Sequence, residues 1–248
     1  MTALPTRRDE SWRYSDLEAV ASVWPIAAPE RIVVAAGDEI ARVIVQDAAP
    51  DVVAIHDYVV VLGAGARATF HVLNTGGRLG RVTIDVTLHD GAHFELGGAM
   101  LGAGEQTLEL VTTMRHIEPN ATSNQTVRSV LGGQATGSYL GKVAVARHAQ
   151  KTDASQSVKA MLLARTATAN AKPELEIFAD DVKCAHGATV GELDANALFY
   201  LASRGLPPAE AKALLLRGFI AGVFDDVADE AAREALEIAA TAALERML

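Results

Sequence analysis

The run RVTIDVTLHDGAHFELGGAML (Arg81–Leu101) decides the fold class of this chain. Its Val, Ile, Thr and Phe residues form two strand-like segments, and the Asp90–Gly91 dipeptide between them is a turn signal. Similar runs recur from about Arg31 to Val190, separated by Gly, Asn and Asp turns about ten residues apart, with no helical pattern between them. The pattern predicts a core made entirely of β-strands.

Two segments of different composition flank this β-rich core. Before it, Trp12, Leu17 and Val20 have roughly helical spacing, which predicts a short, irregular helical lead-in that ends before Pro25. After it, Ala, Leu and Glu dominate. We therefore divide the chain into three predicted parts: a lead-in over residues 1–29, a β core over 30–192 and a helical domain over 193–248.

The predicted helical domain contains three helices. A short one covers about Ala195 to Ser203, and the next begins at Pro207–Pro208, where the fixed backbone of proline suits a helix start. The third covers the run DEAAREALEIAATAALERML that closes the chain. Both longer helices have an amphipathic pattern.

Several all-β architectures are compatible with strands of this length and spacing. An antiparallel sandwich, a cupin-like barrel and a β-helix all repeat short strands and turns. Because the core contains no strict repeat motif of the hexapeptide kind, periodicity alone does not choose among them.

Composition limits the classes of function. The 248 residues are 50% hydrophobic and carry a formal charge of −9, which argues against a protein that follows the phosphates of a nucleic acid. A single cysteine excludes an intrachain disulfide. No apolar run approaches the length of a membrane span, and Arg7–Arg8 is followed by acids where a signal peptide would be apolar. We expect a cytoplasmic protein that binds neither nucleic acid nor membrane.

The single cysteine lies in the run PELEIFADDVKCAHGATVG (Pro173–Gly191), two residues before a histidine. In an extended strand, side chains at i and i+2 leave the same face, so Cys184 and His186 can present a thiol and an imidazole side by side. Such a pair suits a soft metal or sulfur chemistry, although an isolated cysteine is more often a small buried apolar residue.

Several motifs together resemble the SufB/SufD family, the scaffold subunits of the SUF system of iron–sulfur cluster assembly. They run almost continuously from Gln150 to Cys184, notably QKTDA, KPELEI and ADDVKC, and continue in LFYLASRG (Leu198–Gly205). The segment SWRYSDL (Ser11–Leu17) is similar to the entry motif of SufD proteins. The run Cys184-Ala185-His186-Gly187 favours the SufD type, in an unusually short form.

The resemblance implies both a fold and a function. The fold is a right-handed parallel β-helix with a helical C-terminal domain. The function is that of a scaffold rather than an enzyme, acting with a SufB-like subunit and a SufC-like ATPase to build nascent clusters for apoproteins. We expect the strand edge of the end coil to recruit another chain, so that the isolated protein forms a homodimer.

The cysteine count limits what this chain does alone. Iron–sulfur clusters are commonly held by four protein ligands, mostly thiolates, whereas this chain has one thiol. Under the resemblance, Cys184 and His186 are its contribution to a site shared with the partner subunit. We expect no stably bound cofactor, and a transient cluster or iron at most.

The middle helix of the C-terminal domain carries apolar residues over more than half of its circumference. The simplest interpretation is that the β-layer and the last helix cover them within the chain. The resemblance assigns the same region to docking of the SufC ATPase. The residues predicted for that surface are Leu215, Phe219, Ile220, Val223 and Phe224.

The competing hypothesis is a stand-alone all-β enzyme. In a barrel, His89, His93 and Glu95, joined by His71 or His116, could form a metal site of cupin type. The pair Asp180–Asp181 could instead serve a carbohydrate-active enzyme, but successive strand residues point to opposite faces, which favours a turn role.

Overall fold

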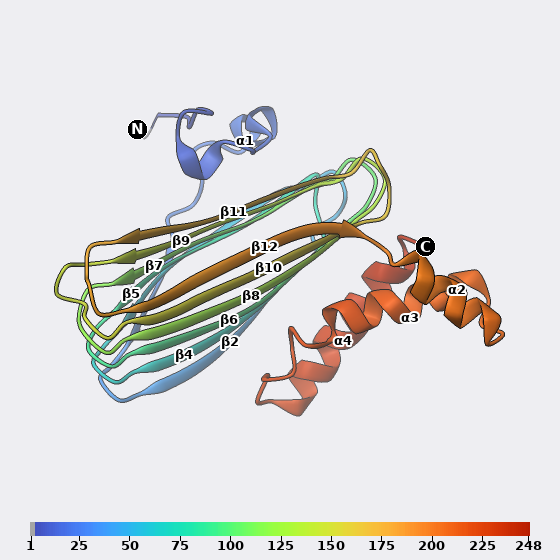
Figure 1. Cartoon of the computed structure of the whole chain (residues 1–248). Coiled ribbons are helices and arrows are strands. Elements are labelled where there is room, and N and C mark those ends of the chain that lie inside the picture. The colour runs from blue at the N-terminus through green and yellow to red at the C-terminus, as the bar shows by residue number, and fades with distance from the viewer. Residues whose placement is uncertain (1–2) are drawn as a thin grey trace.

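The computed structural model describes residues 3–248 and shows a parallel β-helix flanked by helices (Figure 1). Within these residues, twelve strands form two six-stranded sheets, ordered β1-β3-β5-β7-β9-β11 and β12-β10-β8-β6-β4-β2. Every neighbouring pair is parallel. The predicted β-helix is confirmed, and neither a sandwich nor a closed barrel describes the chain.

Odd-numbered strands build the first sheet and even-numbered strands the second. The first sheet contains β1 (Glu30–Val34), β3 (Val53–Leu62), β5 (Leu79–Leu88), β7 (Thr107–His116), β9 (Thr136–Val145) and β11 (Thr168–Ile177). The second contains β2 (Glu39–Gln46), β4 (Arg67–Asn74), β6 (His93–Gly102), β8 (Thr122–Leu131), β10 (Asp153–Leu162) and β12 (Lys183–Glu192). The helices are η1 (Glu10–Trp12), α1 (Leu17–Ser22), α2 (Ala195–Ser203), α3 (Pro208–Ala221) and α4 (Glu230–Glu245).

The core lies between the two sheets, where inward side chains of successive coils form columns. Val60, Val86, Met114, Val143 and Leu175 are register partners in neighbouring strands of the first sheet. The first four of these side chains are fully buried. Burying one such side chain stabilises the fold by about 1.5–3 kcal/mol, so a long column of them holds the coils in register.

The corners between the sheets also stack. At the corner that leads from the first sheet to the second, Gly65 N donates to Asp90 O (2.7 Å) and Gly91 N to Pro119 O (3.0 Å). In the first five of these six corners one residue has a left-handed backbone: Gly37, Gly65, Gly91, Asn120 and Lys151. These positions recur 26 to 31 residues apart. The coils therefore repeat, but the residue type at the left-handed position varies, and so does the number of residues per coil. A search for a fixed sequence motif does not detect such a repeat.

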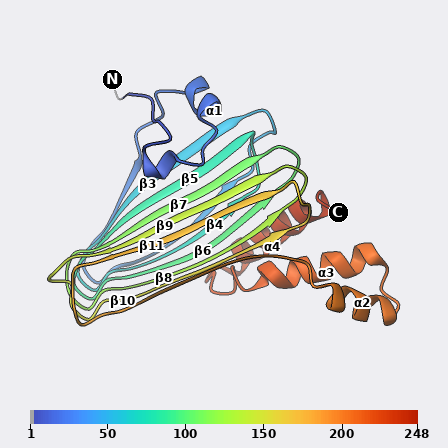
Figure 2. The ribbon, with the colours of Figure 1, turned by 45° about the horizontal axis from the view of Figure 1, so that its top comes forward.

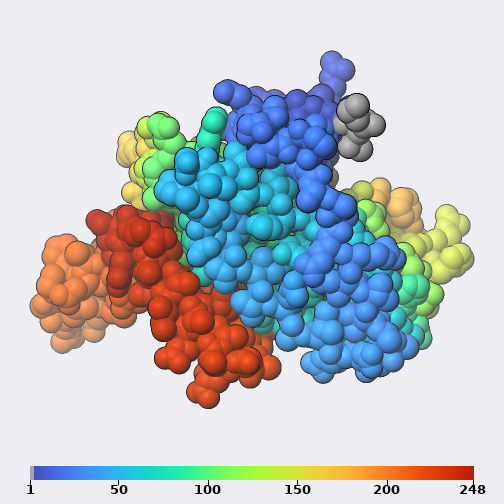
Figure 3. Space-filling view, turned by 180° about the vertical axis from the view of Figure 1, so that it is seen from behind, coloured from blue at the N-terminus to red at the C-terminus, as the bar shows by residue number. Residues whose placement is uncertain are grey.

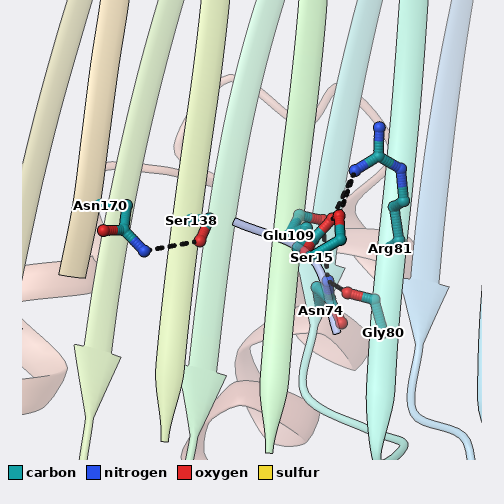
Figure 4. Close-up of polar contacts among 7 residues, drawn as sticks. All are labelled: Ser15, Asn74, Gly80, Arg81, Glu109, Ser138 and Asn170. Atoms are coloured by element: carbon teal, nitrogen blue, oxygen red, sulfur yellow. Dashed lines mark hydrogen bonds and ion pairs between the residues drawn. The ribbon is translucent and has the colours of Figure 1, made fainter. Parts of the chain in front are cut away.

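The lead-in covers the outer face of the first sheet (Figure 1). There, Arg81 of β5 and Glu109 of β7 form an ion pair in which both side chains are 1% exposed. Ser15 Oγ donates to the Glu109 carboxylate at 2.9 Å (Figure 4). The Arg81 guanidinium carbon lies 3.8 Å from the centroid of the Trp12 ring. Removing one partner of a buried ion pair costs about 3–5 kcal/mol. Because Ser15 and Trp12 contact this pair, they anchor the lead-in to the first sheet.

The helices α3 and α4 pack on the outer face of the second sheet near the carboxyl ends of its strands, whereas α2 projects away from the β-helix (Figure 1 and Figure 2). Their apolar side chains pack against Leu73, Leu101 and Val130 of that sheet. A Cβ on Gly97 would collide with the carbonyl oxygen of Val223, so the helical domain approaches the sheet closely at that glycine. Figure 3 shows α4 and the lead-in covering separate parts of the β-helix surface. No helix in residues 3–248 is long and apolar enough to span a membrane.

The left-handed corner predicts a position-dependent effect of alanine. Gly91→Ala should lower the free energy of unfolding by about 1–2 kcal/mol, because a Cβ disfavours its φ of 64° even though no atom lies within 4 Å of it. Gly187→Ala is the matched control, since its Cβ also meets open space and its backbone is not left-handed. Urea denaturation of both variants measures the difference, and equal effects would contradict this account of the corners.

Candidate functional site

The last coil of the β-helix is an open end. Among the described residues, β11 and β12 each have one neighbouring strand, β9 and β10 respectively, in their sheets. Nine of the ten residues of β12 are exposed, and Cys184 is the exception. Val190 lies on the inward column of β12, yet its side chain is 50% exposed, because no further coil covers it. This end therefore offers both unpaired backbone groups and apolar interior surface.

The strand β12 places Cys184 and His186 on its inward face. Their register partners in β10 are Ala154 and Gln156, which are 1% and 3% exposed. Cys184 packs against the main core cluster, whereas His186 is exposed at the open end. The two candidate residues thus lie on one face, as the spacing predicts, and at the edge of the interior.

The Cys184 thiol is not activated within this chain. Burial raises its pKa, the nearby carboxylate of Asp153 raises it further, and a backbone hydrogen bond with Ala154 acts weakly in the opposite direction. A thiolate is the form that binds metals and attacks sulfur. Cys184 therefore needs an approaching cation or metal before it can act as a ligand.

A polar network lies inside the β-helix behind this pair. Thr112 Oγ1 and the Tyr139 hydroxyl both donate to Gln125 Oε1, at 2.6 and 3.0 Å. Gln156 Nε2 donates to the Tyr139 hydroxyl at 3.2 Å. The sequence did not reveal this network, because both faces of the run from Thr122 to Ser129 are polar and give no amphipathic contrast.

The histidines of the competing metal-site hypothesis do not come together. His89 contacts Glu118 Oε1 (3.1 Å) at a corner, while His93 contacts Thr122 Oγ1 (2.7 Å) and lies 3.5 Å from Glu95 Oε2. Residues 3–248 contain no group of three His, Cys, Asp or Glu side chains arranged to hold a metal ion.

The two additional histidines lie elsewhere in the fold. His71 is under the C-terminal helices, where Nε2 lies 2.7 Å from Asp226 Oδ1. His116 is in the interior, where Nε2 lies 2.9 Å from Ser123 Oγ, and burial lowers its pKa to about 4. These two histidines therefore lie in different regions of the fold, and neither joins His89 or His93.

The acidic pair Asp180–Asp181 lies in the corner between β11 and β12, as a turn role predicts. Asp181 is paired with Lys151, and its carbonyl oxygen accepts from Lys151 N at 2.6 Å. The pair closes the last corner and faces solvent.

The predicted docking residues are mostly used within the chain. Ile220, Val223 and Phe224 are 5%, 2% and 1% exposed, because they pack against the second sheet and α4. Leu215 and Phe219 are partly buried. The helix α3 ends at Ala221, so Val223 and Phe224 lie in the following turn. The large apolar side chains left exposed on α2 and α3 are Phe199 (77%), Tyr200 (57%) and Leu214 (51%).

Comparison with known proteins identifies a family domain that covers most of the chain. Residues 26–219 match the SufBD core domain of the SUF system of FeS cluster assembly. The match begins before β1 and ends after β12, so it includes every coil of the β-helix.

The similar proteins are much longer than this chain. An iron–sulfur cluster assembly SufBD family protein of Synechocystis is 33% identical over 175 residues, covering 69% of this chain and 39% of the relative. The assembly protein SufD of Escherichia coli is 29% identical over 175 residues, covering 70% and 41%. The chloroplastic protein ABCI7 of Arabidopsis thaliana is 38% identical over 151 residues, covering 59% and 31%. The chain matches less than half the length of each.

The raised pKa of Cys184 predicts slow alkylation at neutral pH. Iodoacetamide should react faster as the pH rises past the ordinary thiol range, and Asp153→Asn should move this rise to lower pH by removing the second cause of the shift. Because the chain has one cysteine, mass spectrometry reads Cys184 alone. Lys159→Gln, an exposed charge change on the same strand, is the control. Rapid reaction of the parent protein at pH 7 would contradict the prediction.

Proposed function

Because this chain belongs to the SufBD core family of the SUF system, we propose that it is a SufD-type scaffold subunit in iron–sulfur cluster assembly. The observation that carries the proposal is the location of Cys184 and His186 on the inward face of the open last coil. A thiol and an imidazole at an unpaired strand edge are suited to a site that two subunits complete together. In this role the chain holds and orients the cargo, and it catalyses no reaction of its own.

The open edge is the proposed interface with a SufB-like subunit. An added strand would satisfy the free backbone groups of β11 and β12 and cover the exposed apolar side chains of Ile177, Phe178 and Val190. In the absence of that subunit, the same edges of two copies would pair to form a homodimer.

The cluster, or the iron from which it is built, is cargo shared across this interface. One thiol and one imidazole provide two of the roughly four ligands that a cluster takes, so the SufB-like subunit must supply the others. An arriving metal also favours the Cys184 thiolate against the burial that keeps it protonated. Ligand binding by Cys184 is thereby coupled to the arrival of partner and metal.

The proposed docking surface for a SufC-like ATPase lies on α2 and α3. Their exposed side chains Phe199, Tyr200 and Leu214 are large and apolar, a composition typical of interface centres. The partly buried Leu215 and Phe219 border this surface, whereas Ile220, Val223 and Phe224 support it from within.

The site proposal predicts loss of function without loss of fold. Cys184→Ser and His186→Ala should keep the melting temperature close to that of the parent, because β12 is an exposed edge strand. Both should fail to restore cluster assembly in cells that depend on this gene. Thr189→Ala, on the outward face of the same strand, is the control and should complement. Complementation by the double variant would refute the assignment of this pair.

The docking proposal predicts that one charge on α2 weakens ATPase binding. Phe199→Asp should lower the affinity for the SufC-like ATPase of the same organism at least about tenfold, as expected for a central apolar anchor. Ile238→Asp is the control, because Ile238 is similarly exposed (62%) but lies on α4. Calorimetry on the two variants distinguishes them. Unchanged binding by Phe199→Asp, or equal loss in both, would place the docking surface elsewhere.

A further inference from the structure

The buried side-chain amide of Gln156 has a hydrogen-bond partner at one of its two polar atoms. The side chain is 3% exposed, and Nε2 donates to the Tyr139 hydroxyl at 3.2 Å. The other end of the amide, Oε1, is buried and accepts no hydrogen bond. A buried oxygen without a donor destabilises the fold, so a donor at this place would be favoured.

The direction of the amide is fixed from inside the β-helix. Burial raises the pKa of Tyr139, so its hydroxyl stays protonated and donates to Gln125 Oε1 at 3.0 Å. The hydroxyl lone pairs are then available to accept from Gln156 Nε2, which leaves Gln156 Oε1 as the free end. Gly141 preserves this arrangement, because a Cβ there would collide with the Tyr139 hydroxyl and the Gln156 amide.

The residue beside Gln156 in the next coil is His186. The two are register partners in β10 and β12, about 4.7–4.9 Å apart in the hydrogen-bonding direction, and both belong to the inward column. Two residues to either side in the same column, Ala154 is the register partner of Cys184, and Val158 is that of Ala188. Of these three residues of β12, His186 alone has a side-chain nitrogen. Its imidazole is therefore the donor that lies at the position of Gln156.

We propose that Gln156 is a positioning residue for His186: its Oε1 accepts the N–H of the imidazole and leaves the other ring nitrogen, with its lone pair, directed out of the open coil. A neutral histidine carries one N–H, so the hydrogen bond on one nitrogen decides which nitrogen can bind a metal. Histidine ligands commonly have a carbonyl acceptor of this kind behind them. The inference deepens the proposed function and rests on it for the role of His186.

The experiment measures the tautomer of His186 in the purified full chain. The protein is labelled with ¹⁵N-histidine, and its ring nitrogens are recorded at alkaline pH. The His186 signals are assigned by their loss in His186→Gln. In the parent protein one tautomer should dominate. Gln156→Met, of similar shape but without polar atoms, should change the tautomer ratio by about three- to tenfold, the equivalent of one hydrogen bond.

Two further variants separate positioning from packing. Val158→Ala changes the packing at the next level of the same inward column without removing a polar group, and should leave the tautomer ratio unchanged. Gln156→Glu restores an acceptor oxygen and should restore the parent tautomer. Evenly mixed tautomers in the parent protein, or an equal change in Val158→Ala, would overturn the inference.

The spectrum is read on the chain without partners, so it is independent of cluster assembly in cells. Complementation by His186→Ala would refute the proposed function. Absence of a dominant tautomer in the parent protein would refute the role of Gln156 even where His186→Ala fails to complement.

Discussion

Parallel backbone pairing between successive coils is the constraint on which the rest of this structure depends. Pairing fixes the register, and the register decides which side chains face the core, because neighbours along a strand point to opposite faces. A slip of one residue in β10 would bring Ser155 and Ser157 inward and turn Gln156 to the surface. The valine columns of the first sheet and the polar network between the two sheets are therefore set by the same backbone hydrogen bonds. The position of His186 beside Gln156 follows directly from that register.

The pairing leaves two outer sheet faces, and each is covered by a terminal segment through a specific polar contact. On the first sheet the contact is the buried Arg81–Glu109 pair with Ser15, whose partners come from two strands and the lead-in (Figure 4). On the second sheet it is His71 with Asp226, beside the close approach at Gly97. Apolar packing alone is not directional, so these contacts determine where the flanking segments lie. They also leave the last coil uncovered.

The sequence predicted the β-strand core and the helix α2 closely, since both depend on local composition. It could not distinguish a β-helix from other all-β folds without the family resemblance. The reason is physical: the left-handed corner position accepts glycine, asparagine and even Lys151, so the coil repeat leaves no fixed motif. The polar residues of the interior could not be recognised in the sequence, because alternation along a strand identifies the inward face only when the outward face differs in polarity. The predicted docking residues show the reverse error: apolar periodicity identifies a buried face, but it does not say whether the chain or a partner covers Ile220 and Phe224.

The open end is incomplete in two respects, and one event would complete both. Its strand edge has backbone groups without a neighbouring strand, and its thiol has a raised pKa that keeps it protonated. In the proposed complex, an added subunit pairs the edge and brings the further ligands, and the metal held between the subunits favours the Cys184 thiolate. A lone subunit would then bind metal weakly, because burial opposes the ligand form of its only cysteine. Cluster building would be confined to the assembled interface by the electrostatics of this chain, without a separate gate.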